Sequence, residues 1–263
     1  MTPASEPIGE SGGSVKSVGA TLQGWNVAVG NFFFRYRNGL FPGIFLFVAI
    51  VARPGVMFGS PVFDLLLTVC GAFVALTGQL VRLFTIGFEY IHRGGKDGRV
   101  YANRLVQGGV YAITRNPMYV GNALIAIGMT MMAGSPAAYM VVIPFFLFVY
   151  QAIVAAEEEY LRRKFVGEYE EYSAGVNRFL PSWKGVRSLL STMPYDWRRA
   201  VRKDLSTIMG LLIGFIYLPV WRTYFLQGFA AAKAAAVRAL ILSLSAAVLY
   251  GLLLYLKKRK RFF

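Results

Sequence analysis

A short stretch of the chain, RNPMYVGNA from Arg115 to Ala123, places a cation, an amide, a proline and a tyrosine directly before an apolar run. Proline disfavours helical backbone in the residue before it and is accepted in the first turn of a helix, so Pro117 predicts a helix start. Arg115 and Asn116 would then lie at the helix N-terminus, where unpaired N–H groups and a guanidinium favour a carboxylate or phosphate. Taken alone, the stretch favours a simpler interpretation, in which Arg115 snorkels to lipid headgroups and Pro117 is an ordinary helix start.

A second polar group follows a later apolar run, where three glutamates stand in succession from Glu157 to Glu159. One or two of them could bind a cationic ligand, or Arg162 and Arg163 could neutralise them at helical spacing. Beyond the glutamates an apolar stripe predicts a helix that folds back over the site as a lid. The stripe consists of Leu161, Phe165, Tyr169, Tyr172 and Val176.

Composition places both polar groups in a membrane protein, because 56% of the 263 residues are hydrophobic and the mean hydropathy is +0.50. Six apolar runs approach the length of about 17 to 25 residues that crosses hydrocarbon. They cover residues 39–58, 62–88, 118–134, 137–156, 206–221 and 233–256. The predicted fold is all-α, a polytopic membrane protein of about six transmembrane helices.

The break AGSP, from Ala133 to Pro136, predicts an antiparallel hairpin of the third and fourth spans. A hairpin would bring the two polar segments to the same face of the membrane. Most of the 28 lysines and arginines fall on that side of the predicted spans, which predicts cytoplasmic termini. The membrane would be a bacterial inner membrane or the endoplasmic reticulum.

The net charge of +15 lies beside predicted spans, so anionic lipid headgroups are the expected partner rather than nucleic acid. With one cysteine, Cys70, and one histidine, His92, the sequence predicts no intrachain disulfide and no metal site. No glycine-rich phosphate loop or Rossmann pattern occurs. The oligomeric state stays open.

The chain divides into three predicted regions. Residues 1–38 form a polar arm and an interfacial segment, and residues 39–182 form the core. Residues 183–263 hold a basic amphipathic helix from Ser191 at the interface, two further spans and a basic tail.

The pattern VYAITRNPMYVGN, an apolar hairpin and then EEEYLRRKFVGEYEEYSAGVNRFLP resembles the isoprenylcysteine carboxyl methyltransferase and phospholipid methyltransferase superfamily of membrane enzymes. The resemblance covers roughly residues 70 to 182 and implies S-adenosylmethionine (SAM) as cofactor, bound in a cytoplasmic cofactor pocket of the all-α fold. It implies cofactor-binding roles for Tyr111, Arg115, Asn116, Pro117, Tyr119, Gly121, Glu157, Glu158, Tyr169 and Arg178. Two departures are Asn116, where carboxyl methyltransferases commonly have histidine, and Val166 before Gly167. NPMY followed by AGSP is closer to the branch that methylates phosphatidylethanolamine.

SAM carries a sulfonium, an ammonium and a carboxylate, so its site needs a carboxylate and a fork-shaped cation. Glu157 or Glu158 and Arg115 or Arg178 could supply these groups. Methyl transfer is an in-line displacement that depends on alignment and exclusion of water.

A carboxylate acceptor needs no base, whereas an ammonium acceptor must first lose a proton. Glu158, Tyr119 or Tyr169 could assist, and the choice stays open at the level of sequence. The predicted catalytic residues are Arg115, Glu158 and Tyr119.

Arg82 lies within the second predicted span, where a charged side chain costs about 2.5 kcal/mol or more. It is therefore a predicted substrate-binding residue, together with Tyr172. Snorkelling, or pairing with Gln79 or Glu89, explains Arg82 equally well.

The sequence thus predicts an integral membrane methyltransferase that uses SAM and a lipid-like acceptor. The acceptor would be a phospholipid amine or the carboxyl of a prenylated cysteine, and a small thiol remains open. Two other functions compete with this prediction. One is a membrane sterol or lipid reductase that uses NADPH, and the other is a non-catalytic lipid-binding scaffold.

Overall fold

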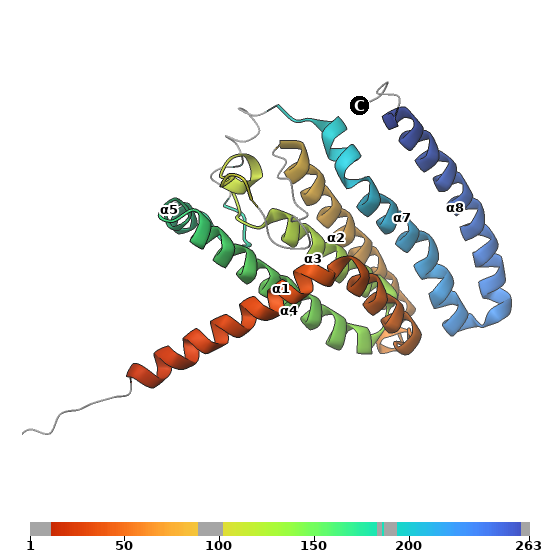
Figure 1. Ribbon diagram of the computed structural model, residues 1–263. Coiled ribbons are helices and arrows are strands. Elements are labelled where there is room, and N and C mark those ends of the chain that lie inside the picture. Colours follow the sequence, from red (N-terminus) through yellow and green to blue (C-terminus); the bar gives the residue numbers. More distant parts are fainter. Residues whose placement is uncertain (1–11, 89–101, 183–185, 187–193, 259–263) are drawn as a thin grey trace, which may run out of the picture.

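Apolar runs bounded by prolines and glycines become long helices in the computed structural model, which describes residues 12–88, 102–182, 186 and 194–258 (Figure 1). The long helices are α1 (Gly12–Val51), α2 (Pro61–Phe88), α3 (Pro117–Ala133), α4 (Pro136–Lys164), α7 (Trp197–Gln227) and α8 (Phe229–Lys258). A short helix α5 (Glu168–Gly175) and two 3₁₀ turns, η1 (Met57–Gly59) and η2 (Gly109–Ala112), complete the described elements. The prediction of an all-α fold is confirmed.

Five of these helices are long and apolar enough to cross a membrane, and α3 is a shorter apolar helix of 17 residues. The chain is therefore a multi-pass membrane protein. The first span was predicted to reach residue 58, but α1 ends at Val51. Pro54 disfavours helical backbone at the residue before it, and Phe58 has a positive φ of 54°.

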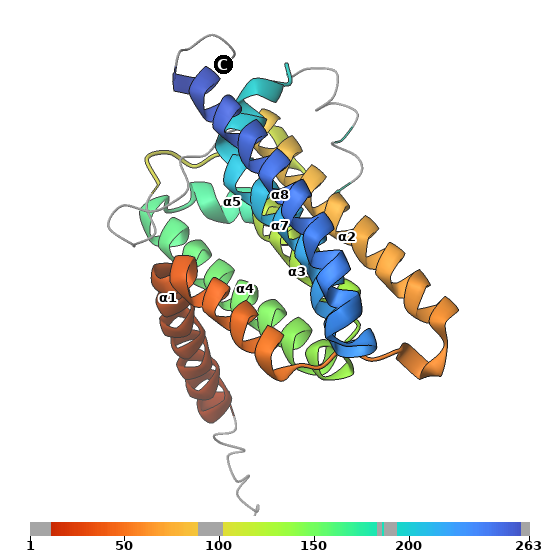
Figure 2. The ribbon, with the colours of Figure 1, turned by 90° about the vertical axis from the view of Figure 1, so that its right-hand side faces the viewer.

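Helix α1 continues through the segment that was expected to lie at the interface before the first span. It bends sharply on its way toward the bundle, as Figures 1 and 2 both show. Pro42 lies inside the helix and accounts for such a bend, because its ring clashes with the preceding turn and removes one hydrogen bond. The first part of the predicted polar arm, residues 1–11, lies outside the described residues.

The α3–α4 hairpin forms as the AGSP break predicts. Gly134 ends α3 with a left-handed backbone (φ 65°), and Ser135 caps α4 by accepting a hydrogen bond from the Ala138 N–H at 3.4 Å. Pro136 occupies the first turn of α4. We call this end of the bundle the hairpin end, and the opposite end, where α3 begins and α4 finishes, the site end.

Helices α2 and α3 pack with their backbones in direct contact. A Cβ added at Gly78 would lie 2.6 Å from the carbonyl oxygen of Gly121, and one added at Gly71 would lie 2.7 Å from that of Gly128. Small residues permit this close approach between membrane helices. Helix α1 packs on α4, α7 packs on α2 and α3, and α8 packs on α7 (Figure 2).

The basic segment before the fifth span was predicted to be an amphipathic helix at the interface. From Trp197 onward it is instead the first part of α7, which runs unbroken through the span. Asp196 caps α7 by accepting from the Arg199 N–H at 2.9 Å. The Arg199 guanidinium donates to the carbonyls of Ile86 (3.1 Å) and Gly87 (2.6 Å), which satisfies the end of α2. The part of this prediction from Ser191 to residue 193 lies outside the described residues.

Candidate functional site

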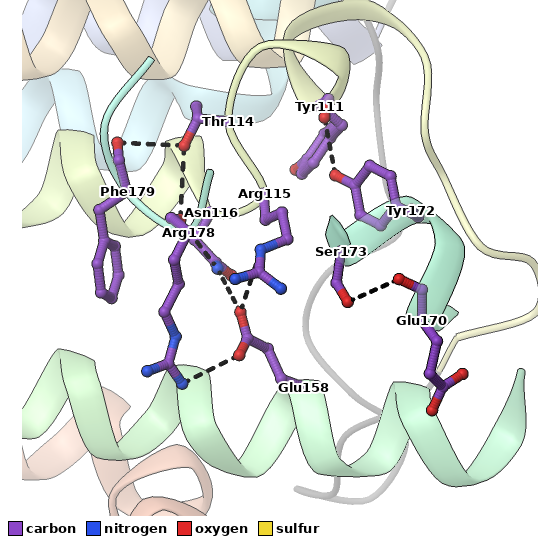
Figure 3. Close-up of polar contacts among 10 residues, drawn as sticks. All are labelled: Tyr111, Thr114, Arg115, Asn116, Glu158, Glu170, Tyr172, Ser173, Arg178 and Phe179. Atoms are coloured by element: carbon purple, nitrogen blue, oxygen red, sulfur yellow. Dashed lines mark hydrogen bonds and ion pairs between the residues drawn. The ribbon is translucent and has the colours of Figure 1, made fainter. Parts of the chain in front are cut away.

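Two segments far apart in the sequence run side by side at the site end (Figure 3). The Arg115 N–H donates to the Asn177 carbonyl at 2.9 Å, and the Ser182 N–H donates to the Ile113 carbonyl at 2.9 Å. The Thr114 hydroxyl donates to the Phe179 carbonyl at 3.1 Å. These hydrogen bonds join the first sequence motif to the end of the second.

Glu158 is the centre of the site. Its carboxylate lies 3.0 Å from Nη2 of Arg178 and 3.8 Å from Nε of Arg115, and it accepts a hydrogen bond from Nδ2 of Asn116 at 3.1 Å (Figure 3). Glu158 is 7% exposed and Asn116 is 4% exposed. Two guanidiniums around one carboxylate leave the cluster with an excess of positive charge, next to the N-terminus of α3.

The two neighbouring glutamates make different contacts, because successive residues of a helix point in different directions. Oε1 of Glu157 accepts a hydrogen bond from the Tyr119 hydroxyl at 2.6 Å. Glu159 pairs with Arg162 (3.3 Å) and Arg163 (2.7 Å). The predicted neutralisation by these two arginines therefore falls on Glu159 and leaves the other two glutamates to the site.

Helix α5 folds back against the site, as the lid prediction required. The single apolar stripe is broken between α4 and α5, where Gly167 adopts a positive φ of 79° that a side chain would oppose. Tyr169 and Tyr172 of α5 are buried, and the Tyr172 hydroxyl donates to the Tyr111 carbonyl at 2.7 Å. Burial, followed by the nearby Glu158 carboxylate, raises the pKa of Tyr169 to about 12, so its hydroxyl keeps its proton.

Pro117 and Gly121 occupy the first turns of α3. Pro117 begins the helix as predicted, directly after Asn116 at the N-cap position. Gly121 faces α2, where an added Cβ would lie 2.6 Å from Cγ of Arg82. The structure thus gives Gly121 a packing role, and its cofactor-binding role stays a prediction.

A cavity of about 1160 Å³ begins beside Tyr111 and Tyr119 and continues between α1, α3, α4 and α7 toward the hairpin end. Polar side chains line it near the site end, and they include Arg37, Asn38, Arg82, Asn122, Lys203 and Thr207. Apolar side chains line the remainder, among them Val48, Ala126, Val142, Leu218 and Trp221. Tyr119 lines this cavity and its hydroxyl contacts Glu157, so the cavity and the charged cluster share this residue as a wall.

Arg82 lies on the cavity wall with its guanidinium already engaged. It forms a buried ion pair with Asp204 of α7, donates to Asn122, and donates to Thr207 at 3.0 Å. Gln79 does not pair with Arg82 directly but donates to the same Asp204 carboxylate at 2.7 Å. The substrate-binding role of Arg82 stays a prediction, and its other proposed partner, Glu89, lies outside the described residues.

Asp204 was missed by the sequence reasoning, although a signal existed. An acidic residue at the edge of one apolar run can satisfy a cation buried in another, because an unpaired charge inside a membrane protein is costly. Matching Arg82 against every acidic residue near a span would have included Asp204 among the candidates.

Comparisons with known proteins find relatives of the central part of the chain. A family model described as phospholipid methyltransferase matches residues 65–168, from α2 to the start of α5. The cobalt-zinc-cadmium resistance protein CzcN of Cupriavidus metallidurans is 30% identical over 166 residues, which cover 60% of this chain and 69% of that protein. An uncharacterized protein of Haemophilus influenzae is 40% identical over 63 residues, which are 24% of this chain and the whole of that protein. No solved structure shows a significant match.

Fold, site and comparisons together define a membrane methyltransferase that acts on lipid-like substrates. The chain belongs to the phospholipid methyltransferase family. Arg178 and the whole of α1 and α7 lie outside the matched residues, although all three contribute to the site or to the cavity.

Proposed function

We propose that the chain transfers a methyl group from SAM, held at the charged cluster, to an amphiphilic acceptor in the cavity. One observation carries the proposal. Tyr119 lines the cavity and donates its hydroxyl hydrogen bond to Glu157, which is the neighbour in sequence of Glu158 at the centre of the cluster. A polar cofactor and an apolar acceptor can therefore come into direct contact beside this one side chain.

The residues of the cluster fit the charges of SAM. The positive excess of Arg115 and Arg178 around Glu158 suits the cofactor's carboxylate. Within the described part of the chain Tyr119 is the group that hydrogen-bonds Glu157, so this carboxylate keeps acceptor capacity for the cofactor's ammonium. When bound, SAM would supply a methyl group on a positively charged sulfur that departs as a neutral thioether.

The protein contributes alignment, dryness and a route for a proton. Tyr169 and Tyr172 are buried where α5 covers the cluster, which keeps water from that side. Glu158 is occupied by its ion pairs with Arg115 and Arg178 and by the hydrogen bond from Asn116, and Tyr169 keeps its proton. Tyr119 and Glu157 remain, and together they can take a proton from an acceptor in the cavity, with the proton coming to rest on the Glu157 carboxylate.

The acceptor that this arrangement favours is the amine of a phospholipid. A protonated amine must lose a proton before it can be methylated, and the Tyr119–Glu157 pair offers a group to receive it. A prenylcysteine carboxylate would need no such pair. That acceptor is the alternative outcome of the experiment below.

The placement in the membrane follows from the same proposal. SAM would enter from the cytoplasm, so the site end and both termini would face that side, in agreement with the distribution of basic residues. Both relatives named above come from bacteria, which favours a bacterial inner membrane over the endoplasmic reticulum. Anionic headgroups would be the lipid neighbours of the basic segments.

The test is transfer of a labelled methyl group from SAM into a total lipid extract by the purified full-length chain. We expect label in a phospholipid headgroup, identified by mass spectrometry, whereas a base-labile methyl ester would point to the carboxylate acceptor. Glu158→Gln should weaken SAM binding about tenfold or more, because a neutral amide no longer holds Arg115 and Arg178 by ion pairs in the arrangement that receives the cofactor's carboxylate.

Glu171→Gln is the matched control for this variant, since Glu171 is exposed on α5. It should bind SAM as the unaltered chain does. Purified protein that neither binds SAM nor labels any lipid would refute the proposed function.

A further inference from the structure

The cavity is built largely from helices outside the matched residues 65–168. Helix α1 contributes one wall and α7 another, with residues from Arg37 to Ala52 and from Lys203 to Trp221. We propose that Arg37 and the Gly210 face of α7 select the acceptor. Arg37 would bind an anionic group, phosphate or carboxylate, and the tail would pass Gly210 toward Trp221. The inference rests on the proposed function only in naming this ligand the methyl acceptor.

The charge of the polar end favours an anion. Four side chains with a formal charge line the cavity, namely Arg37, Arg82, Lys203 and Asp204. Arg82 and Asp204 neutralise each other in their ion pair, so the charge that α1 brings to the cavity is that of Arg37. The Arg37 guanidinium lies 4.2 Å from the ring centroid of Phe34 and has no carboxylate partner among the described residues. The planar guanidinium of Arg37 can therefore bind an oxyanion through two hydrogen bonds.

The cavity, from its polar end to Trp221, has the length of a long hydrocarbon chain with its head group. Lys203 and Trp221 are eighteen residues apart on α7, which corresponds to about 27 Å of helix. An added Cβ at Gly210 would meet nothing within 4 Å, so this face of α7 is open. At the hairpin end the Trp221 indole N–H donates to the Ala49 carbonyl at 2.9 Å and joins α7 to α1. A single tail running from the polar end to Trp221 fits this shape.

The test uses quenching of tryptophan fluorescence by bromine at the tail end of four 18-carbon probes. The probes carry a phosphate, a carboxylate, an alcohol or an ammonium at the other end, and the full-length chain is held in detergent. We expect saturable quenching by one or both anions, at about tenfold lower concentration than by the alcohol. Whichever of the two anionic probes quenches at the lower concentration shows whether the site prefers a phosphate or a carboxylate. Equal quenching by all four heads would overturn the proposal, as would quenching that survives Trp221→Phe.

Two matched pairs of variants place the ligand. Arg37→Gln should raise the concentration of anionic probe needed for half-quenching about tenfold, whereas Arg35→Gln, an exposed neighbour outside the cavity, should not. Gly210→Leu should abolish the quenching, whereas Gly251→Leu, on α8 with equally open surroundings, should leave it intact. If the two variants of each pair had the same effect on quenching, the assignment of the ligand to Arg37 and Gly210 would be refuted.

The quenching requires neither SAM nor methyl transfer, so its outcome is separate from that of the labelling experiment. Loss of labelling with retained quenching would count against the proposed reaction and leave the ligand site standing. Suppose instead that labelling is retained, and that quenching depends neither on the head group nor on Arg37→Gln. That result would refute the ligand site and leave the proposed reaction standing.

Discussion

Arg82 of α2 and Asp204 of α7 form a buried ion pair in register with a second pair between the same two helices. Arg82 is 9% exposed and Asp204 is 1% exposed. At the hairpin end Nη2 of Arg222 lies 2.6 Å from Oδ2 of Asp64. The same interval of eighteen residues separates the charged residues on α2 and on α7, so antiparallel packing in one register satisfies both pairs. A shift by one turn would leave four charges unpaired.

The first prediction concerns this register. Asp204→Ala should destabilise the protein by about 3–5 kcal/mol, because it leaves the Arg82 guanidinium buried without its counter-ion. Thermal unfolding in detergent measures the effect. Arg82→Leu combined with Asp204→Leu should recover much of the loss, since both buried charges are then gone. Glu171→Ala, at an exposed carboxylate, is the control, and an equal loss in Asp204→Ala and Glu171→Ala would contradict the role of the pair.

Much of this fold could be predicted because the signals are local. Apolar length locates the helices, and Pro117 and Pro136 locate two of their starts. The AGSP break predicts the hairpin, and the hairpin brings the glutamates near Arg115. Hydrophobicity alone could not tell which helices are neighbours, so the partnership of α7 with α2 was not foreseen.

The rest of the site depends on tertiary contacts that a single sequence does not display. Asn116 and Arg178 reach one carboxylate only because residues 113–116 pair with residues 177–182. The break before α5 depends on the positive φ of Gly167, which composition does not reveal. The basic segment after residue 196 looked interfacial by charge, but Arg199 is used to cap α2.

The second prediction tests the proton route. Tyr119→Phe keeps an aromatic ring at this position of the cavity lining and removes the hydroxyl that donates to Glu157. We expect kcat with an amine acceptor to fall by roughly 10²–10⁴, while KM for the acceptor changes little. Steady-state kinetics with labelled SAM measure both constants. Tyr139→Phe, which loses a hydrogen bond at the hairpin end, serves as control. A kcat that Tyr119→Phe leaves unaltered would point to an acceptor that needs no base.

The third prediction concerns the contact between α2 and α3. Gly128→Ala adds a methyl group where the backbones of Gly71 and Ala75 already stand, so overpacking should cost about 1–3 kcal/mol. Gly251→Ala adds the same group in open space on α8 and should stabilise by up to about 1 kcal/mol through helix propensity. Unfolding of the two variants in the same detergent compares them directly. Similar stabilities would mean that the two helices can move apart at little cost.

The fourth prediction concerns Tyr169 and alkaline pH. Burial and the Glu158 carboxylate raise the pKa of Tyr169 from 10 to about 12, so between these values the native state holds a proton that the unfolded chain releases. The stabilising contribution is therefore fully present below pH 10 and is lost as pH rises toward 12, by roughly 2 kcal/mol in total. Tyr169→Phe has no such proton and should show a flatter decline in stability over this interval. Unfolding midpoints at several alkaline pH values measure the two slopes, with Tyr160→Phe, outside the buried cluster, as control. Parallel declines in all three proteins would show that Tyr169 ionises as easily in the native state as in the unfolded chain, and α5 would then not seal the cluster from water.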